Sequence, residues 1–88
     1  MFYVYMIHSP STGRFYYGFT SDLEQRLLRH NQRREKATRH GAPWNMVGYL
    51  TCDNRSHAMT TESKLKCFKN PQKAIEYIQQ HGNLISIP

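Results

Sequence analysis

Two tyrosines, one arginine, one histidine and one glutamate have types and spacing that could carry out chemistry together. In chain order they are Tyr5, Tyr16, Arg26, His30 and Glu62. Each lies in a segment that is otherwise rich in apolar residues, where an unpaired polar group costs free energy. Two phenols, a guanidinium, an imidazole and a carboxylate could instead hold a divalent metal ion and a phosphodiester.

The glutamate is the only carboxylate of this set. Glu62 falls on the apolar stripe of a helix predicted over roughly 57–69. The stripe consists of Ala58, Leu65 and Phe68. One carboxylate, completed by water and a substrate phosphate, is a usual arrangement for Mg²⁺. A buried ion pair with an arginine such as Arg26 explains this glutamate equally well, and both explanations stay open.

The tyrosines belong to two predicted strands. Residues 2–8 and 14–19 are rich in aromatic and β-branched side chains, and the turn-forming residues 9–13 join them into a hairpin. Residues that share a face are Tyr3, Tyr5 and Ile7 on the first strand, and Tyr16 and Gly18 on the second. The glycine indicates a bulge or a close approach by another chain.

A phenol becomes a useful base only when its pKa is lowered. A nearby metal ion and an arginine would do this for Tyr5, so that it could accept a proton from water. Taken singly, each tyrosine in these strands more often fills space in a sheet. The chemical interpretation therefore depends on the whole set of five residues.

The arginine and the histidine lie on a predicted first helix. Residues 21–24 form a capping box, so the helix begins there. Leu23 and Leu27 form its buried stripe, and Arg26 and His30 are four residues apart on a face that borders this stripe. Residues 31–43 are polar and basic and predict a loop.

Further elements follow this loop. Residues 44–52 predict a third strand, and residues 54–56 offer N-caps for the helix over 57–69. Asn70 and a proline at the next position predict the start of a third helix, which ends near Gly82. Its inward residues are Ala74, Ile75 and Ile78. The tail 83–88 predicts either a short edge strand or an extended arm. Together these elements predict an α+β fold in which about three helices flank a three-stranded antiparallel sheet, in the order β-β-α-β-α-α.

Size and charge bound the class of protein. A chain of 88 residues has room for one domain, covering 1–88. Its net charge is +6, which favours polyanionic partners. Six of the twelve basic residues fall within fourteen positions: Arg26, Arg29, Arg33, Arg34, Lys36 and Arg39. Such a cluster predicts salt-dependent binding to phosphates without sequence readout, which we favour over a merely solvated helix face and loop.

The cysteines and the N-terminal segment give no sign of export or of a zinc site. Cys52 and Cys67 do not form a metal-binding pattern. The apolar start of the chain is only seven residues long, too short for a signal peptide or a membrane span. We therefore expect a cytoplasmic protein with no membrane partner and no small-molecule cofactor.

The order and spacing of these residues resemble the GIY-YIG nuclease superfamily. The matching pieces are Val4-Tyr5-Met6, Tyr16-Tyr17-Gly18, Arg26 with His30, and Glu62 with Lys66. The resemblance covers about residues 2–78. It is strongest to small single-domain members, which are related to the N-terminal nuclease module of the UvrC excision-repair protein. The stretch 36–39 also resembles a basic Thr-Arg loop of small members. The first signature departs from the family pattern in lacking its glycine and isoleucine, and Tyr17 replaces an isoleucine in the second.

The resemblance implies metal-dependent hydrolysis of a phosphodiester in nucleic acid, DNA more than RNA. It implies that Glu62 is the sole protein ligand of Mg²⁺ or Mn²⁺ and that Tyr5 is the general base or orients the attacking water. Tyr16 would bond near the phosphate, Arg26 would neutralise developing charge, and His30 would assist proton transfer or contact phosphate. Further residues that could contribute are Tyr3, Gly18, Lys66 and Asn70. Asn70 matches a carboxamide of several members, although its N-cap role is the stronger interpretation.

Two other functions remain as alternatives. The first is a nuclease-like module that binds nucleic acid without cutting it, which the same basic cluster would serve. The second is an interaction protein whose aromatic hairpin docks a partner, which predicts exposed tyrosines and no convergent pocket. Specificity and oligomeric state are left open by the sequence.

Overall fold

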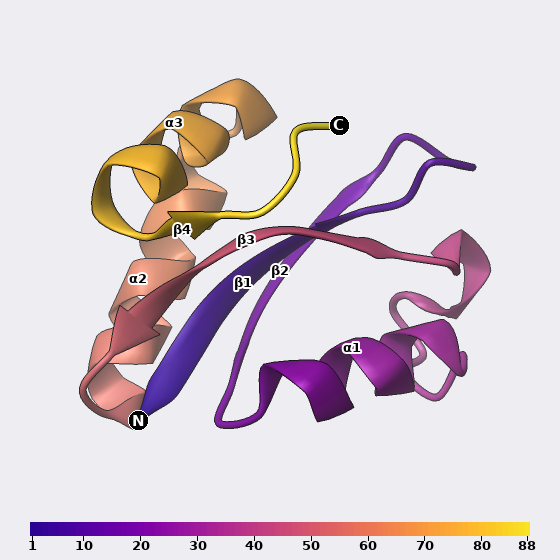
Figure 1. Ribbon diagram of the computed structural model, residues 1–88, viewed down its shortest axis with the longest axis horizontal. Helices are drawn as coiled ribbons and strands as arrows, with labels where there is room; N and C mark the ends of the chain where they lie inside the picture. Colours follow the sequence, from indigo (N-terminus) through magenta and orange to yellow (C-terminus); the bar gives the residue numbers. More distant parts are fainter.

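The structure is a computed structural model that describes all 88 residues, and it has α+β architecture (Figure 1). The elements in chain order are β1 (Phe2–His8), β2 (Phe15–Thr20), α1 (Leu23–Asn31), the short 3-10 helix η1 (Arg39–Gly41), β3 (Asn45–Cys52), α2 (Arg55–Cys67), α3 (Pro71–His81) and β4 (Asn83–Leu84). The strands form one antiparallel sheet in the order β2-β1-β3-β4. Strand β2 is therefore an outer strand, with one side free of strand pairing.

The sheet has four strands rather than the predicted three. The fourth is the two-residue β4, which pairs with β3 through Gly48 and Leu84. The tail is held further by the Ile85 and Ser86 amides, which both donate to the carbonyl of Val47. The short edge strand was one of the two expectations for this tail. A two-residue strand is too short to show the alternation that predicts strands from sequence.

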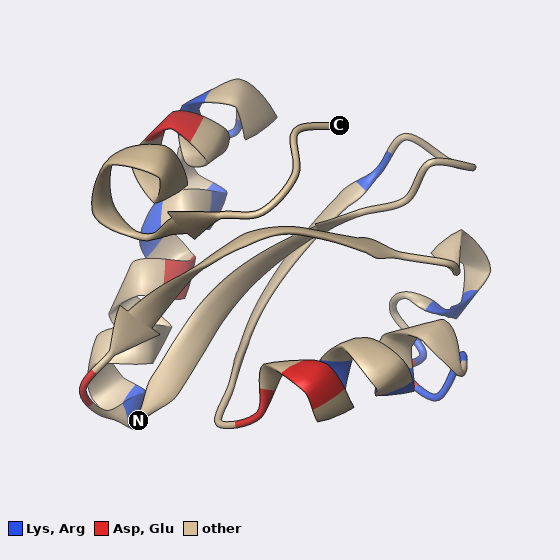
Figure 2. Cartoon of the chain, in the orientation of Figure 1, with Lys and Arg blue, Asp and Glu red and all other residues tan.

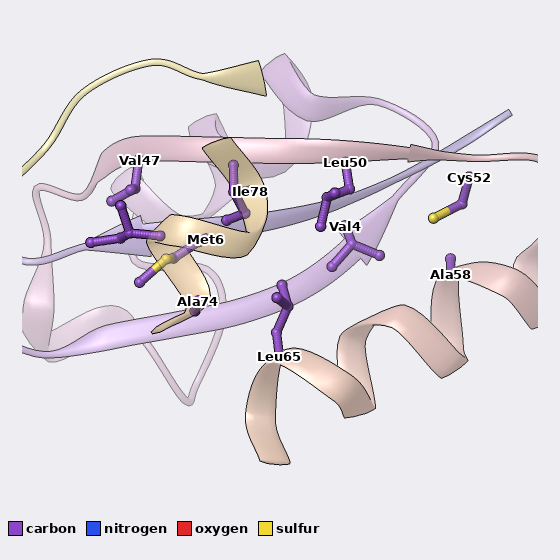
Figure 3. Close-up of a cluster of buried hydrophobic side chains, with 10 residues drawn as sticks. Val4, Met6, Val47, Leu50, Cys52, Ala58, Leu65, Ala74 and Ile78 are labelled. Carbon is purple, nitrogen blue, oxygen red and sulfur yellow. The ribbon is translucent and has the colours of Figure 1, made fainter. Parts of the chain in front are cut away.

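Alternation along β1 divides the core between the two faces of the sheet. Val4 and Met6 face α2 and α3 and pack in the larger cluster, which contains ten buried residues (Figure 3). Tyr5 and Ile7 face the opposite side, where they pack with Trp44 and with α1. Figure 1 shows the same division, with α2 and α3 on one side of the sheet and α1 on the other. A site that combines residues of α1 and of α2 must therefore take side chains from both faces of the sheet.

Helix boundaries follow from their caps. Asp22 caps α1, since its Oδ1 accepts a hydrogen bond from the amide of Gln25 at 3.1 Å. The capping box predicted at 21–24 is therefore wrong by one residue, because Asp22 takes the role expected of Ser21. Asn54 caps α2, which begins and ends two residues earlier than predicted. Asn70 caps α3 by accepting from the amide of Gln72, as predicted.

No helix in the structure combines the length and the apolar character needed to cross a membrane.

Candidate active site

A cleft of about 370 Å³ follows the outer strand β2 and collects four of the five residues singled out in the sequence. We call it the edge cleft. Its lining residues are Phe2, Tyr5, Tyr16, Tyr17, Gly18, Phe19, Thr20, Ser21, Arg26, Arg55 and Glu62. Side chains from both faces of the sheet contribute, because the cleft lies along β2. The structure thus brings together Tyr5, Tyr16, Arg26 and Glu62. The interaction-protein alternative does not fit, because it predicts exposed tyrosines and no such pocket.

The pairing of β1 with β2 sets the position of the Tyr5 ring. Tyr5 lies opposite Gly18, and Tyr16 lies opposite Ile7 in the same continuous register. A Cβ at position 18 would lie 2.4 Å from the hydroxyl oxygen of Tyr5, closer than atoms can approach. The glycine therefore makes room for the phenol. The predicted bulge is wrong, because the register is continuous through Gly18, and its close neighbour is the Tyr5 side chain.

His30 is buried beside Tyr5 and does not line the edge cleft. The Tyr5 hydroxyl and His30 Nε2 are 2.9 Å apart, and His30 Nδ1 is 2.6 Å from the hydroxyl of Thr38. Trp44 fixes the backbone at Thr38, because its indole N–H donates to the Thr38 carbonyl at 2.8 Å. His30 is only 1% exposed, so direct contact with a phosphate does not fit this arrangement. His30 instead contacts Tyr5, and Tyr5 lines the cleft.

Burial opposes ionisation of both members of this pair. Burial raises the pKa of Tyr5 to about 12, although the positive charge of Arg26 acts in the other direction. Arg26 does lower the pKa of Tyr5, as expected, but desolvation has the larger effect, so the pKa is raised overall. Burial also lowers the pKa of His30, and Arg26 and Arg29 act in the same direction while Glu35 opposes them. A neutral phenol thus faces a neutral imidazole at pH 7.

Glu62 is paired with Lys66 rather than with Arg26. Its Oε2 lies 2.6 Å from the Lys66 ammonium, one turn along α2. The carboxylate side chain is 18% exposed and lines the edge cleft, whereas Lys66 is 54% exposed. The carboxylate therefore stays open to solvent and to ligands.

The donor set around Glu62 limits the kind of metal site that could form. No group of three or more histidine, cysteine, aspartate or glutamate side chains lies close enough to hold a metal ion. A divalent ion in the edge cleft would have Glu62 as its protein carboxylate and take its other ligands from water and phosphate. Hard cations such as Mg²⁺ tolerate this arrangement well, so the residues present fit such an ion.

Arg55 is a cleft residue that the sequence reasoning missed. It is the first residue of α2 and lines the edge cleft together with Glu62. Its guanidinium lies over the ring of Phe19, 5.6 Å from the ring centre. A spacing of seven residues places two side chains on the same face of a helix. The spacing between 55 and 62 could therefore have identified this arginine.

The basic cluster continues from α1 into the loop that follows it. Figure 2 shows Lys and Arg in blue along this loop, whereas acidic residues gather at the start of α1. Arg29 is paired with Glu35 at 2.8 Å, so part of its charge is compensated. The other loop residues that are predicted to bind nucleic acid are exposed, namely Arg33, Arg34, Lys36 and Arg39.

Tyr3 and Asn70 lie outside the edge cleft. Tyr3 packs its ring edge-on against Tyr49 at 5.8 Å, and both line a separate small pocket with Asp22. Asn70 is exposed at the start of α3, where it serves as the N-cap. The structure therefore does not bring either residue to the other candidates.

Comparisons with known proteins identify the family of the chain. The sequence model of the GIY-YIG catalytic domain matches residues 1–75. A UPF0213 protein from Streptococcus pyogenes serotype M5 (strain Manfredo) is 31% identical over 80 residues, which cover 90% of this chain and 86% of the relative. A UPF0213 protein from serotype M3 (strain ATCC BAA-595 / MGAS315) is 34% identical over 67 residues, covering 75% and 73% of the two chains. No solved structure matches. GIY-YIG domains are nuclease domains that act on nucleic acid and usually use a divalent metal ion. The chain belongs to the GIY-YIG catalytic domain family.

Proposed function

We propose that this protein is an endonuclease that hydrolyses phosphodiester bonds in DNA with the help of one divalent ion, Mg²⁺ or Mn²⁺. The observation that carries this proposal is the meeting of Tyr5, Tyr16, Arg26 and Glu62 in one cleft. These residues come from two strands and two helices on opposite faces of the sheet. Core packing alone gives no reason for them to converge on a solvent-filled space.

Each cleft residue has a role that suits its chemistry. Glu62 would hold the metal ion, which when bound polarises the scissile phosphate and stabilises the leaving 3′ oxygen. Arg26 lines the same cleft and would neutralise negative charge that develops on the phosphoryl oxygens. Tyr16 donates a hydrogen bond to the phosphate or to the attacking water. Arg55 adds a second cation to the same cleft.

The pair of Tyr5 and His30 supplies a route for the proton of the attacking water. At pH 7 the phenol is neutral, because its pKa is about 12. His30 can donate Nδ1–H to the Thr38 hydroxyl and accept the Tyr5 proton at Nε2. Tyr5 then takes a proton from water as it passes its own proton to His30. The phenol stays neutral, and the buried imidazole ends with the positive charge.

The exposed basic residues would hold the rest of the substrate. Arg29, Arg33, Arg34, Lys36, Arg39 and Lys66 are predicted to contact the phosphate backbone. Contacts of this kind position a nucleic acid and carry no sequence information by themselves. We therefore expect recognition by shape and by strand state rather than by base sequence.

Substitution of the single carboxylate tests the proposal. Purified Glu62→Gln should lose metal-dependent cleavage, whereas Glu76→Gln on the exposed face of α3 should cleave like the parent chain. Labelled single-stranded, duplex and branched DNA should each be incubated with Mg²⁺ and with Mn²⁺. Glu62→Gln is nearly isosteric, so circular dichroism should report an unchanged fold.

Two results would overturn the assignment. Cleavage that persists at the parent rate in Glu62→Gln would remove Glu62 from the reaction. Salt-dependent binding of these substrates by the parent chain, with no cleavage of any of them, would support the alternative of an inactive nucleic-acid-binding module.

A further inference from the structure

A second pocket adjoins the edge cleft and has no role in the reaction just described. It has a volume of about 550 Å³ and lies between the β1–β2 hairpin and the loop that contains η1. Tyr16 lines both spaces, so they adjoin at this residue. We call the second space the hairpin pocket.

The walls of the hairpin pocket combine aromatic rings with positive charge. Phe15, Tyr16, Trp44 and His40 supply the rings, and Arg14 supplies a guanidinium. No carboxylate lines the pocket. A flat aromatic ligand that carries negative charge nearby therefore suits it better than a cationic or aliphatic one. A nucleotide has this combination, and stacking of bases on aromatic side chains tolerates any base.

The floor of the pocket is held in place before any ligand arrives. Trp44 is 5% exposed, and its indole N–H donates to the Thr38 carbonyl at 2.8 Å. Asn31 of α1 bonds both the amide and the carbonyl of Trp44. A ring that is already fixed loses little side-chain entropy when a base packs against it.

We propose that the hairpin pocket receives the base of an unpaired nucleotide whose neighbouring phosphate lies in the edge cleft. This inference rests on the proposed function and names its substrate class, which is DNA that is single-stranded at the cleavage site. A base inside a duplex is paired and stacked, so it cannot enter a pocket lined by side chains unless it leaves the helix. Arg14 and the exposed loop arginines hold the flanking phosphates.

Trp44 offers a direct test, because it is the only tryptophan of the chain. A short single-stranded oligodeoxynucleotide and its blunt duplex should be titrated into the protein without metal, with chelator present, while tryptophan fluorescence is recorded. We expect the single strand to quench Trp44 and the duplex to bind more weakly without quenching. An RNA strand of the same sequence should be titrated in parallel to compare the two sugars.

Variants of the hairpin pocket separate binding of a base from attraction of the DNA to basic residues. Ala37 is exposed and lines the hairpin pocket, so Ala37→Leu narrows the pocket and leaves every charge in place. We expect it to weaken single-strand binding about tenfold, the scale of one lost base stack. His40→Ala removes a ring instead and should act in the same direction. The matched control is Gln79→Leu, which adds the same side chain on the exposed surface of α3.

The outcomes distinguish this inference from the proposed function. Equal quenching by duplex and single strand, or parent affinity in both Ala37→Leu and His40→Ala, overturns the base pocket while Glu62-dependent cleavage stands. Single-strand quenching that Ala37→Leu abolishes, in a chain that cleaves nothing, supports base binding and overturns the nuclease proposal. Absence of binding to either form of DNA overturns the base pocket, and the cleavage assay with Glu62→Gln then decides the nuclease proposal separately.

Discussion

Gly18→Ala tests whether the position of the Tyr5 hydroxyl limits the reaction. The added methyl group would lie 2.4 Å from the hydroxyl oxygen and 2.7 Å from the ring carbon that carries it. Ordinary contacts begin at 3.4 Å. The phenol must therefore withdraw by about 1 Å, which disturbs its 2.9 Å contact with His30.

Stability and activity should respond differently to this substitution. Forcing one extra methyl group into a packed site costs about 1–3 kcal/mol, so the chain should stay folded with a lower Tm. Displacing a reacting group by about 1 Å can cost about 100-fold in rate. We expect cleavage to slow by about this factor under conditions in which the variant is fully folded.

The matched control is Gly13→Ala in the β1–β2 turn. Gly13 has a φ of +75° and no atom within 4 Å of an added Cβ, so the substitution strains the backbone without touching the edge cleft. Thermal melts followed by circular dichroism and single-turnover cleavage at 25 °C should be measured for both variants. A parent cleavage rate in Gly18→Ala, or an equal loss of rate in the two variants, would refute the role given to the Tyr5 position.

Two further substitutions bear on the site. Burial holds the pKa of His30 below its ordinary value of 6.5, so the imidazole of His30 binds a proton more tightly in the unfolded chain than in the folded one. The contribution of His30 to stability is therefore complete above pH 6.5 and is lost as the pH falls. Urea unfolding at pH 7.5 and 5.5 should show that His30→Gln loses less unfolding free energy between these two pH values than the parent chain does. An identical loss in the two proteins would contradict the assignment. Lys66→Ala removes an exposed partner of Glu62, so stability should change by less than about 1 kcal/mol. The Mg²⁺ concentration for half-maximal cleavage should fall because the ammonium no longer competes, and a rise would show that Lys66 assists metal binding.

Local patterns in the sequence predicted the elements well, because each depends on near neighbours. Residues 2–8 form β1 as predicted, and the Asn70 cap and the proline after it begin α3. The N-cap of α1 was placed one residue early, since Ser21 and Asp22 both have side chains able to cap a helix. In the structure the side chain of Asp22 caps the helix, and the Thr20 hydroxyl accepts a hydrogen bond from the amide of Asp22 at 3.0 Å.

Properties that depend on how deeply a side chain is buried could not be predicted from the sequence. The charge of Arg26 beside Tyr5 suggested a lowered pKa, but burial of the phenol has the larger effect. Helix spacing placed His30 on the face of Arg26, yet only one of the two side chains lines the edge cleft. Thr38 belongs to the stretch 36–39 that resembles a Thr-Arg loop of the family, but its bond to His30 depends on how the loop returns over the sheet.

The position of β2 at the edge of the sheet explains how this small protein can assemble a site from both of its cores. Tyr5 packs in the cluster on the α1 side, whereas Glu62 extends from α2 on the other side. Within the sheet these faces are separated by backbone, and only beside an outer strand can side chains from both reach one space. A neighbouring strand paired to β2 would occupy that place. The free edge of β2 is therefore a requirement of the site, and a second chain that added a strand there would close it.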